Sequence, residues 1–199
     1  IRDLTVQWKA YGAMVGSWNM LVYGTALFVM TRIKGDDTIA HSRLAFYMYF
    51  LGFANLLFGW AHHIYIVPVA MWIRMISYFI SMTELLILGK IILNWKNSLS
   101  EAKRDFHILP YKFIIASDVW VFFNLTLALV ISVPAINVYT HGTHVTVAHS
   151  MGSTIGINTM ILLASAFFLI RDITKYEFTE IQNKVITFGF WIFNIFFLI

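Results

Sequence analysis

Long runs of apolar residues alternate with short polar connections along the whole chain. The apolar runs lie near residues 12–31, 44–66, 71–95, 113–133, 145–170 and 185–199. The first five are long enough for a helix to cross a bilayer, which takes about 17–25 residues. Barrel strands are much shorter, whereas a helix satisfies its own backbone hydrogen bonds within lipid. The pattern therefore predicts an all-α, polytopic transmembrane bundle of about six helices.

The composition agrees with a membrane protein and excludes an ordinary soluble domain. Of the 199 residues, 59% are hydrophobic and 12% are charged, against about 45–50% and about 25% in soluble domains. The chain opens on Ile1 and closes within an apolar run. We therefore expect residues 1–199 to form a single membrane domain that is a fragment of a larger protein. Its partners are then lipid and the remaining helices of the same subunit or of a companion chain.

Two further features of the composition narrow the chemistry. The sequence has no cysteine, which excludes thiolate-ligated clusters, so a metal ion must be held by His, Met, Tyr or carboxylate side chains. The net charge of +4 does not indicate nucleic-acid binding, because basic residues of membrane proteins collect in cytoplasmic loops.

The position of the basic residues orients the helices. If the helices alternate in direction, the connections 32–43, 96–112 and 171–184 share one side of the membrane. With the helix end that precedes 96–112, this side holds 11 of the 14 basic residues: Arg32, Lys34, Arg43, Lys90, Lys96, Lys103, Arg104, Lys112, Arg171, Lys175 and Lys184. The positive-inside rule makes these loops cytoplasmic. Five of the seven histidines fall at the opposite, outward ends: His62, His63, His141, His144 and His149.

Two carboxylates lie within the predicted helices, where ionisable residues are costly and usually functional. Asp118 is close to a helix end and to Lys112, so a capping or interfacial role is favoured. Glu84 lies in the middle of its helix, with no basic residue within one turn. A role in proton transfer or metal binding and a structural role as a buried neutral carboxyl are equally favoured for Glu84.

The adjacent His62 and His63 point about 100° apart on a helix. Both therefore reach one metal ion only near a helix end or a distortion, which the nearby Pro68 favours. By itself the pair is better explained as two interfacial histidines. Together with His149 at the same depth it indicates a metal or haem site, because imidazole is a common ligand of haem iron and of non-haem iron, copper or zinc.

His149 and Met151 are two residues apart, about 200° around a helix, so they face nearly opposite sides. One helix could then hold two haems, one on each flank. Both side chains are competent axial ligands, and a His/Met haem generally has a higher potential than a bis-His haem. The sequence contains nine methionines, so ordinary packing is the main alternative for Met151.

Several segments resemble the catalytic subunit of the haem–copper oxidase superfamily, and specifically its nitric oxide reductase branch. Gly59–Tyr65 resembles the helix whose two histidines bind the non-haem metal, and Ser81–Glu84 resembles a segment whose glutamate lies near that metal. Val133–Thr143 followed by Val147–His149 is similar to the lead-in and start of the helix that binds the haems. The resemblance covers about residues 11–199 and implies half of a twelve-helix subunit.

The resemblance implies a role for each of these histidines. His62 and His63 would bind a non-haem iron or copper, and His149 would bind a high-spin b-type haem that faces this metal. His141 lies in the lead-in and is a further cofactor-binding candidate. Met151 stands where the family has a second haem-binding histidine, which implies either a low-spin haem with His/Met ligation or the loss of that haem.

Two further departures concern the metal site. The family has a third metal-binding histidine on the preceding helix, and the corresponding region around Tyr11 has no histidine or carboxylate. Glu84 would then complete the metal site, which favours iron, or deliver protons, and Tyr11 would be an alternative oxygen ligand. Leu56 stands where oxygen-reducing relatives have a tyrosine, which argues against oxygen reduction, although Tyr11, Tyr47 and Tyr49 leave a possible substitute.

The resemblance implies a membrane oxidoreductase that reduces nitric oxide to nitrous oxide. It would lie as a multi-pass protein in the bacterial cytoplasmic (inner) membrane and take electrons from a cytochrome c-type or quinol donor. Alternatives are a degenerate or divergent paralogue that serves as an electron-transfer or structural subunit, and a variant that rearranges nitric oxide or reduces oxygen.

Overall fold

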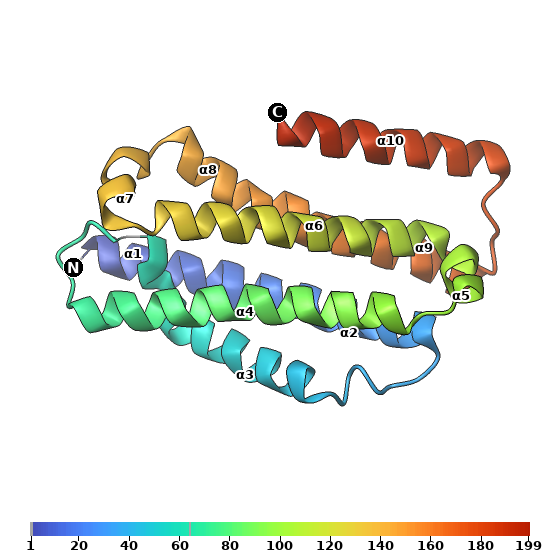
Figure 1. The fold of residues 1–199 in the computed structure, drawn as a ribbon, viewed down its shortest axis with the longest axis horizontal. Coiled ribbons are helices and arrows are strands. Elements are labelled where there is room, and N and C mark those ends of the chain that lie inside the picture. Colours follow the sequence, from blue (N-terminus) through green and yellow to red (C-terminus); the bar gives the residue numbers. More distant parts are fainter. Residues whose placement is uncertain (1, 64) are drawn as a thin grey trace.

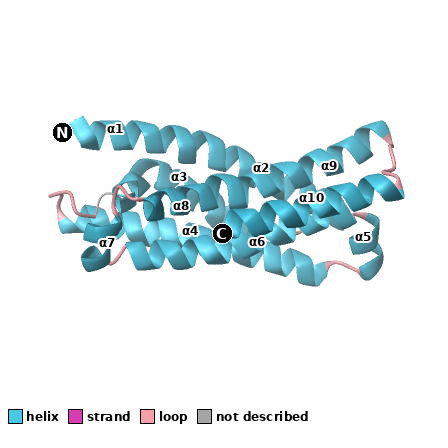
Figure 2. Cartoon of the chain, turned by 90° about the horizontal axis from the view of Figure 1, so that it is seen from above, coloured by secondary structure: helices cyan, strands magenta, loops and turns pink. Residues whose placement is uncertain are grey.

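The computed structural model describes residues 2–63 and 65–199, without the side chains of Asp3, Leu4 and His63. Every regular element in these ranges is a helix (Figures 1 and 2). In chain order the elements are α1 Arg2–Tyr11, η1 Gly12–Asn19, α2 Met20–Lys34, α3 Arg43–Phe58, η2 Gly59–His63, α4 Met71–Ser98, α5 Glu101–Phe106, α6 Ile108–Ile131, α7 Pro134–Thr140, α8 His144–Met151, η3 Gly152–Thr159, α9 Met160–Thr174 and α10 Glu180–Leu198.

Consecutive elements join into six helices that are long and apolar enough to cross a membrane within the described ranges. These spans are Thr5–Lys34, Arg43–His62, Met71–Ser98, Ile108–Ile131, His144–Thr174 and Glu180–Leu198. The predicted all-α polytopic bundle is thus confirmed. Several of these spans are longer than the apolar stretches of the sequence. A helix, once nucleated, continues into its polar flanks until a cap or a residue in the left-handed conformation ends it. Gly35, with φ of 80°, ends α2 in this way.

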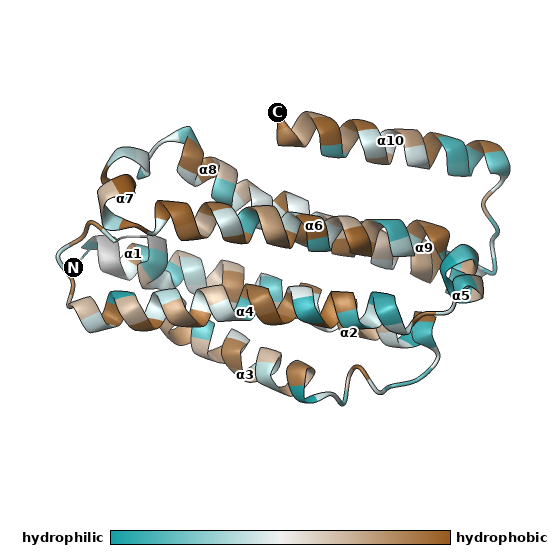
Figure 3. Cartoon of the chain, viewed as in Figure 1, coloured by the Kyte–Doolittle hydropathy of each residue, from teal (hydrophilic) through white to brown (hydrophobic). Residues whose placement is uncertain are grey.

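The two ends of the bundle differ. The connections α2–α3, α4–α6 and α9–α10 lie together at one end, which we call the basic end, and polar residues gather there (Figures 1 and 3). The N-terminus, η2, α7 and the start of α8 lie at the other end, which we call the histidine end (Figure 1). Two short helices, α5 and α7, stand in connections where the hydrophobic pattern predicts no helix. The Ser100 side chain caps α5, and Pro134 begins α7.

The exterior of the bundle is apolar, as expected for a surface that faces lipid. Large side chains such as Phe79, Phe122 and Phe196 are exposed, by 68%, 67% and 71%. Helix α10 is the most peripheral element, and it contacts α6 through the Phe190–Phe113 ring pair and a hydrogen bond from Trp120 Nε1 to Asn194 Oδ1 of 2.8 Å.

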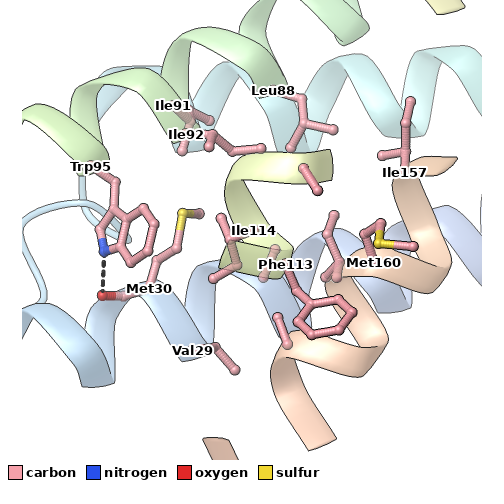
Figure 4. Packing of buried hydrophobic residues seen from close by; sticks show 14 of the residues in the cluster. Val29, Met30, Leu88, Ile91, Ile92, Trp95, Phe113, Ile114, Ile157 and Met160 are labelled. Atoms are coloured by element: carbon pink, nitrogen blue, oxygen red, sulfur yellow. Dashed lines mark hydrogen bonds between the residues drawn. The ribbon is translucent and has the colours of Figure 1, made fainter. Parts of the chain in front are cut away.

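Towards the basic end, the interior is a packed apolar core from α2, α4, α6, η3 and α9 (Figure 4). Met30, Leu88, Ile92 and Trp95 are fully buried there. The indole Nε1 of Trp95 donates to the Met30 carbonyl oxygen at 3.0 Å, so its one polar group is satisfied.

Two π-helical segments, η1 and η3, follow α1 and α8 directly. The wider π-helical turn is uncommon and often lies at functional sites. The two segments are joined by a hydrogen bond from Asn158 Nδ2 to Asn19 Oδ1 of 2.8 Å. Close approach of η3 to α6 requires glycine, because a Cβ at Gly156 would lie 2.6 Å from the Trp120 ring.

Candidate functional site

A cavity of about 210 Å³ opens between the helices on the side of the histidine end, because residues of α1 and η2 line it. Six polar or titratable residues, each from a different element, contribute to its wall: Tyr11, Asn55, His62, Glu84, Asn124 and His149. All six are buried. Four of the residues that the sequence singled out therefore share one cavity, although they lie far apart along the chain.

His62 lies in η2, the 3-10 turn Gly59–His63 that follows α3 directly. Its Nδ1 lies 2.6 Å from the Gly59 carbonyl oxygen, which also accepts from Ser77 Oγ at 2.7 Å. Since a carbonyl only accepts, Nδ1 is the protonated nitrogen and Nε2 is the acceptor. This is the tautomer that binds metals in proteins, where a backbone carbonyl commonly orients the ring. The side chain of His63 lies outside the described part of the chain.

His149 faces His62 across the cavity. It lies near the end of α8, is 6% exposed, and its ring centroid is 6.2 Å from that of His62. Its ring also hydrogen-bonds with the backbone of Asn124 on α6. The ring edge of Tyr11 completes the group, with centroids 5.4 Å from His62.

Met151 lies on the other side of the same helix. It is 41% exposed, outside the cavity, and its sulfur accepts a weak hydrogen bond from Thr154 Oγ1 at 3.9 Å. The two-residue spacing thus separates the His149 and Met151 side chains as the helical geometry requires.

Glu84, Asn55 and Tyr11 form a hydrogen-bonded chain along the cavity wall. The Tyr11 hydroxyl donates to Asn55 Oδ1 at 2.6 Å, and Asn55 Nδ2 donates to Glu84 Oε2. Glu84 is 2% exposed, and its other oxygen, Oε1, has no hydrogen-bond partner within the described ranges. The three side chains come from α1, α3 and α4, so this series of hydrogen bonds arises only from the packing of these helices.

The other candidate residues lie elsewhere. His141 follows α7 at the histidine end, half-buried and not part of the cavity wall. Tyr47 and Tyr49, two of the possible substitutes for a tyrosine at Leu56, are 54% and 59% exposed on α3 and are not part of the cavity wall. Tyr11 is thus the candidate tyrosine that the fold brings beside His62.

Asn55 and Asn124 were missed by the sequence analysis. Both are buried in the middle of apolar helices, where a polar side chain usually marks a helix–helix contact or a site. Asn55 also precedes His62 by seven residues, which places the two on one helix face. These two signals together could have identified Asn55.

A metal ion or a haem is not part of the structure, so the fit of the residues decides what they could hold. Among the described side chains, no three from His, Asp and Glu converge as a metal site; His63 is not included in this statement. The donor types nevertheless fit in part: His62 is in the metal-binding tautomer, and the His149 ring lies buried opposite it on the cavity wall. Each of the two histidines thus has one property expected of a residue that binds a metal ion or a haem.

At the basic end, two groups outside the membrane spans have shifted pKa values. The pKa of His107 is lowered by burial and by the nearby Arg171 guanidinium. The pKa of Asp36 is lowered by hydrogen bonds from Thr38 and Lys34. Arg171 also stacks its guanidinium 3.6 Å from the Phe106 ring centroid. These contacts stabilise the connections, far from the cavity.

One comparison with known proteins gives a match. The model of the family described as cytochrome c and quinol oxidase polypeptide I matches residues 2–199. No curated protein and no solved structure matches the chain significantly.

Proposed function

Since this chain belongs to the cytochrome c and quinol oxidase polypeptide I family of haem–copper membrane oxidoreductases, we propose that its cavity reduces nitric oxide to nitrous oxide. The overall reaction joins two nitric oxide molecules, two electrons and two protons to give nitrous oxide and water. The observation that carries the proposal is a buried carboxyl, Glu84, in the same cavity as His62 and His149. Protons must reach a site within the membrane, and a carboxyl that lines the cavity can deliver them.

In this proposal the histidines hold the redox groups. His149 would hold a high-spin b-type haem, and His62 with His63 would hold a non-haem iron or copper. When bound, these groups supply the electrons and the positions at which nitric oxide binds. Met151, on the outer side of its helix, would hold a low-spin haem against helices that come from elsewhere in the subunit or from a companion chain.

The remaining residues act on protons and on water. Glu84 lines the cavity, its Oε2 accepts from Asn55, and its Oε1 is buried without a hydrogen-bond partner among the described residues. Tyr11 and the apolar neighbours of the cavity, Val15 and Leu85 among them, limit the water around the site. We assign Glu84 to proton delivery rather than to metal ligation, because its Oε2 is already bonded to Asn55.

The setting is proposed on the same basis. The basic end would face the bacterial cytoplasm, with loops 32–43, 96–112 and 171–184 inside, as the positive-inside rule requires. The cavity would then lie nearer the outer face of the membrane. A cytochrome c-type protein or a quinol would supply the electrons. Residues 1–199 would be one membrane domain of a larger subunit.

Oxygen reduction is the second candidate, and Tyr11 is the observation that favours it. Four-electron reduction of oxygen in this superfamily uses a tyrosine beside the metal, and the Tyr11 ring lies edge-on to His62. The missing tyrosine at Leu56 then no longer excludes this reaction. Measuring nitric oxide and oxygen consumption on the same preparation separates the two candidates.

The test is an optical and metal analysis of the purified complete complex, followed by turnover. Two b-type haems with one additional iron or copper, and nitrous oxide formed at half the rate of nitric oxide loss, would support the proposal. One haem without an additional metal, and no turnover, would overturn it in favour of a degenerate electron-transfer or structural subunit. Nitric oxide loss without electron uptake would indicate the rearranging variant.

A further inference from the structure

The rotation of α8 decides which of its side chains faces the cavity. Helix α8 runs without a break into η3, and η3 runs into α9 of the apolar core. His149 lies three residues before η3, is 6% exposed and lines the cavity, whereas Met151 is 41% exposed. The winding of η3 therefore sets the rotation of α8 relative to the core, and with it the direction of His149.

The π winding of η3 has a large effect on this rotation. A π-helix takes roughly one residue more per turn than an α-helix, because its hydrogen bonds join residues five apart instead of four. Over the eight residues of η3, the two windings differ by roughly 100–150°. If η3 were α-helical and α9 stayed in place, Ser150 or Met151 would take the position of His149 at the cavity.

The core end of η3 is fixed by its neighbours. Asn158 is 0% exposed, and its Nδ2 donates to Asn19 Oδ1 at 2.8 Å. Close by, a Cβ at Gly156 would lie 2.6 Å from the Trp120 ring, so α6 packs tightly against this part of η3. A change in winding must therefore appear at the other end, where η3 meets α8.

At that other end, Gly152 lies against the Asn124 side chain of α6. A Cβ at Gly152 would be 2.6 Å from Asn124 Oδ1 and 3.1 Å from its Cγ, which leaves room for glycine only. Asn124 is 3% exposed, and both polar atoms of its amide are enclosed without a hydrogen-bond partner among the described residues. In an α-helical η3, Ser153 or Thr154 would come against Asn124, and the Cβ of either would collide with it. The contact thus admits the π winding and disfavours the α winding.

We propose that Gly152 and Asn124 are positioning residues, whose contact selects the π winding of η3 and so turns His149 towards the cavity. Neither residue exchanges a proton or holds the substrate in this role. The inference deepens the proposed function, and it rests on that function only for the group that His149 binds. The direction of His149 is a property of the chain itself.

The test measures the rotation of α8 in the complete complex by pulsed electron paramagnetic resonance. Spin labels are attached at Val145→Cys in α8 and at Met71→Cys at the start of α4, two positions that are 37% and 71% exposed. The sequence has no native cysteine. The variants are Gly152→Ala and Asn124→Ala. The control is Gly24→Ala, because a Cβ at Gly24 meets nothing within 4 Å.

The expected result is a single label distance in the wild type and in the control, and a second distance in both Gly152→Ala and Asn124→Ala. The second distance should differ from the first by up to about 10 Å, the diameter of a helix with its side chains. The double variant should show no more of it than either single variant, because both changes remove the same contact. One of the two haems should be lost in proportion, since fewer molecules direct His149 at the cavity.

The wild-type distance alone in both variants would overturn the inference, even if their stability falls, because the contact would then serve packing only. If Gly152→Ala does not accumulate, Asn124→Ala decides by itself, since it removes the contact without adding an atom. If the wild-type complex lacks the haems but the second distance appears in the variants, the proposed function is wrong and the positioning role stands. If the wild type binds two haems and reduces nitric oxide but the variants keep its single distance, the proposed function stands and this inference is wrong.

Discussion

The half of the helix bundle near the basic end, which we call the core half, and the half that holds the cavity, which we call the cavity half, are built from the same helices. Their interiors differ. Towards the basic end, α4 buries Leu88, Ile92 and Trp95 against other apolar side chains. About one turn before Leu88, the same helix buries Glu84 beside Asn55. Helix α6 likewise buries Ile114 in the apolar core and Asn124 at the cavity. The exterior of the bundle is apolar in both halves, so the interior alone distinguishes them.

This difference has a physical reason. Within lipid, apolar packing between helices gains little from water exclusion, so close fit and satisfied hydrogen bonds hold a bundle together. The core half achieves close fit with apolar side chains. The cavity half carries polar groups whose burial is costly unless they are paired, which is expected where a site performs chemistry. Changes in the two halves should therefore separate stability from activity.

Glu84→Gln should have the largest effect, and it should fall on activity. Loss of a positioned general acid typically costs about 10²–10⁴-fold in rate, while glutamine keeps the size of the side chain and an acceptor for Asn55. Nitric oxide consumption at saturating electron donor is the measurement, with Glu101→Gln in exposed α5 as the control. Full turnover with intact metal content would assign Glu84 a structural role. The polar residues of the cavity half would then contribute to stability, as the residues of the core half do, and not to the reaction.

Trp95→Ala should instead have its main effect on stability. Truncating a fully buried tryptophan typically costs about 3–5 kcal/mol of stability, and Trp95 is 0% exposed. We expect a large decrease in thermal unfolding temperature in detergent, with the haem spectrum unchanged below the transition. The exposed Trp72, at 61%, provides the control Trp72→Ala, which should unfold almost as the wild type does. Equal losses in the two variants would contradict a packed core.

Tyr11→Phe should have an intermediate effect on stability and should discriminate between the two candidate reactions. The change leaves Asn55 Oδ1 without its donor, which costs about 1–3 kcal/mol. Nitric oxide reduction should continue at a reduced rate, whereas oxygen reduction that depends on a tyrosine should stop. Tyr47→Phe, in an exposed side chain of α3, is the matched control for both rates. Loss of both activities in Tyr11→Phe would show that Tyr11 holds the site together rather than donating in one reaction.

The smallest expected effect is a pH dependence of stability at the basic end. Burial and Arg171 lower the pKa of His107 below its ordinary value. The unfolded chain therefore binds a proton on His107 before the folded protein does, so the stabilisation is complete above about pH 6.5 and is lost as the pH falls through the folded pKa. Unfolding temperatures between about pH 5 and 8 should show this slope in the wild type and a weaker slope in His107→Gln.

A control at the same end of the bundle is the exposed His41, whose ring pairs with Asp37 at 3.2 Å. The His41→Gln variant should keep the wild-type slope. If His107→Gln and the wild type show the same slope, the groups around Arg171 do not titrate as described.

Some features of the candidate site could be predicted from the sequence and others could not. The spacing of His149 and Met151 predicted their separation onto two sides of one helix, because helical geometry is local. The depth of His62 and His149 followed from counting helices, and the structure brings both to one cavity. Asn55 could not be linked to Glu84 in the same way. Their hydrogen bond joins residues 29 positions apart on neighbouring helices, and it depends on how the two helices rotate against each other.

Composition, run length and the placement of charge determined that this chain is a membrane-spanning helical bundle and which of its ends carry histidines or basic residues. These properties follow from the cost of polar groups in lipid, which acts on each segment separately. Only the tertiary structure decided that Tyr11, Asn55 and Glu84 form one hydrogen-bonded chain beside His62. Such contacts arise from the packing of side chains between helices, and a linear pattern does not contain the rotation and offset that this packing selects.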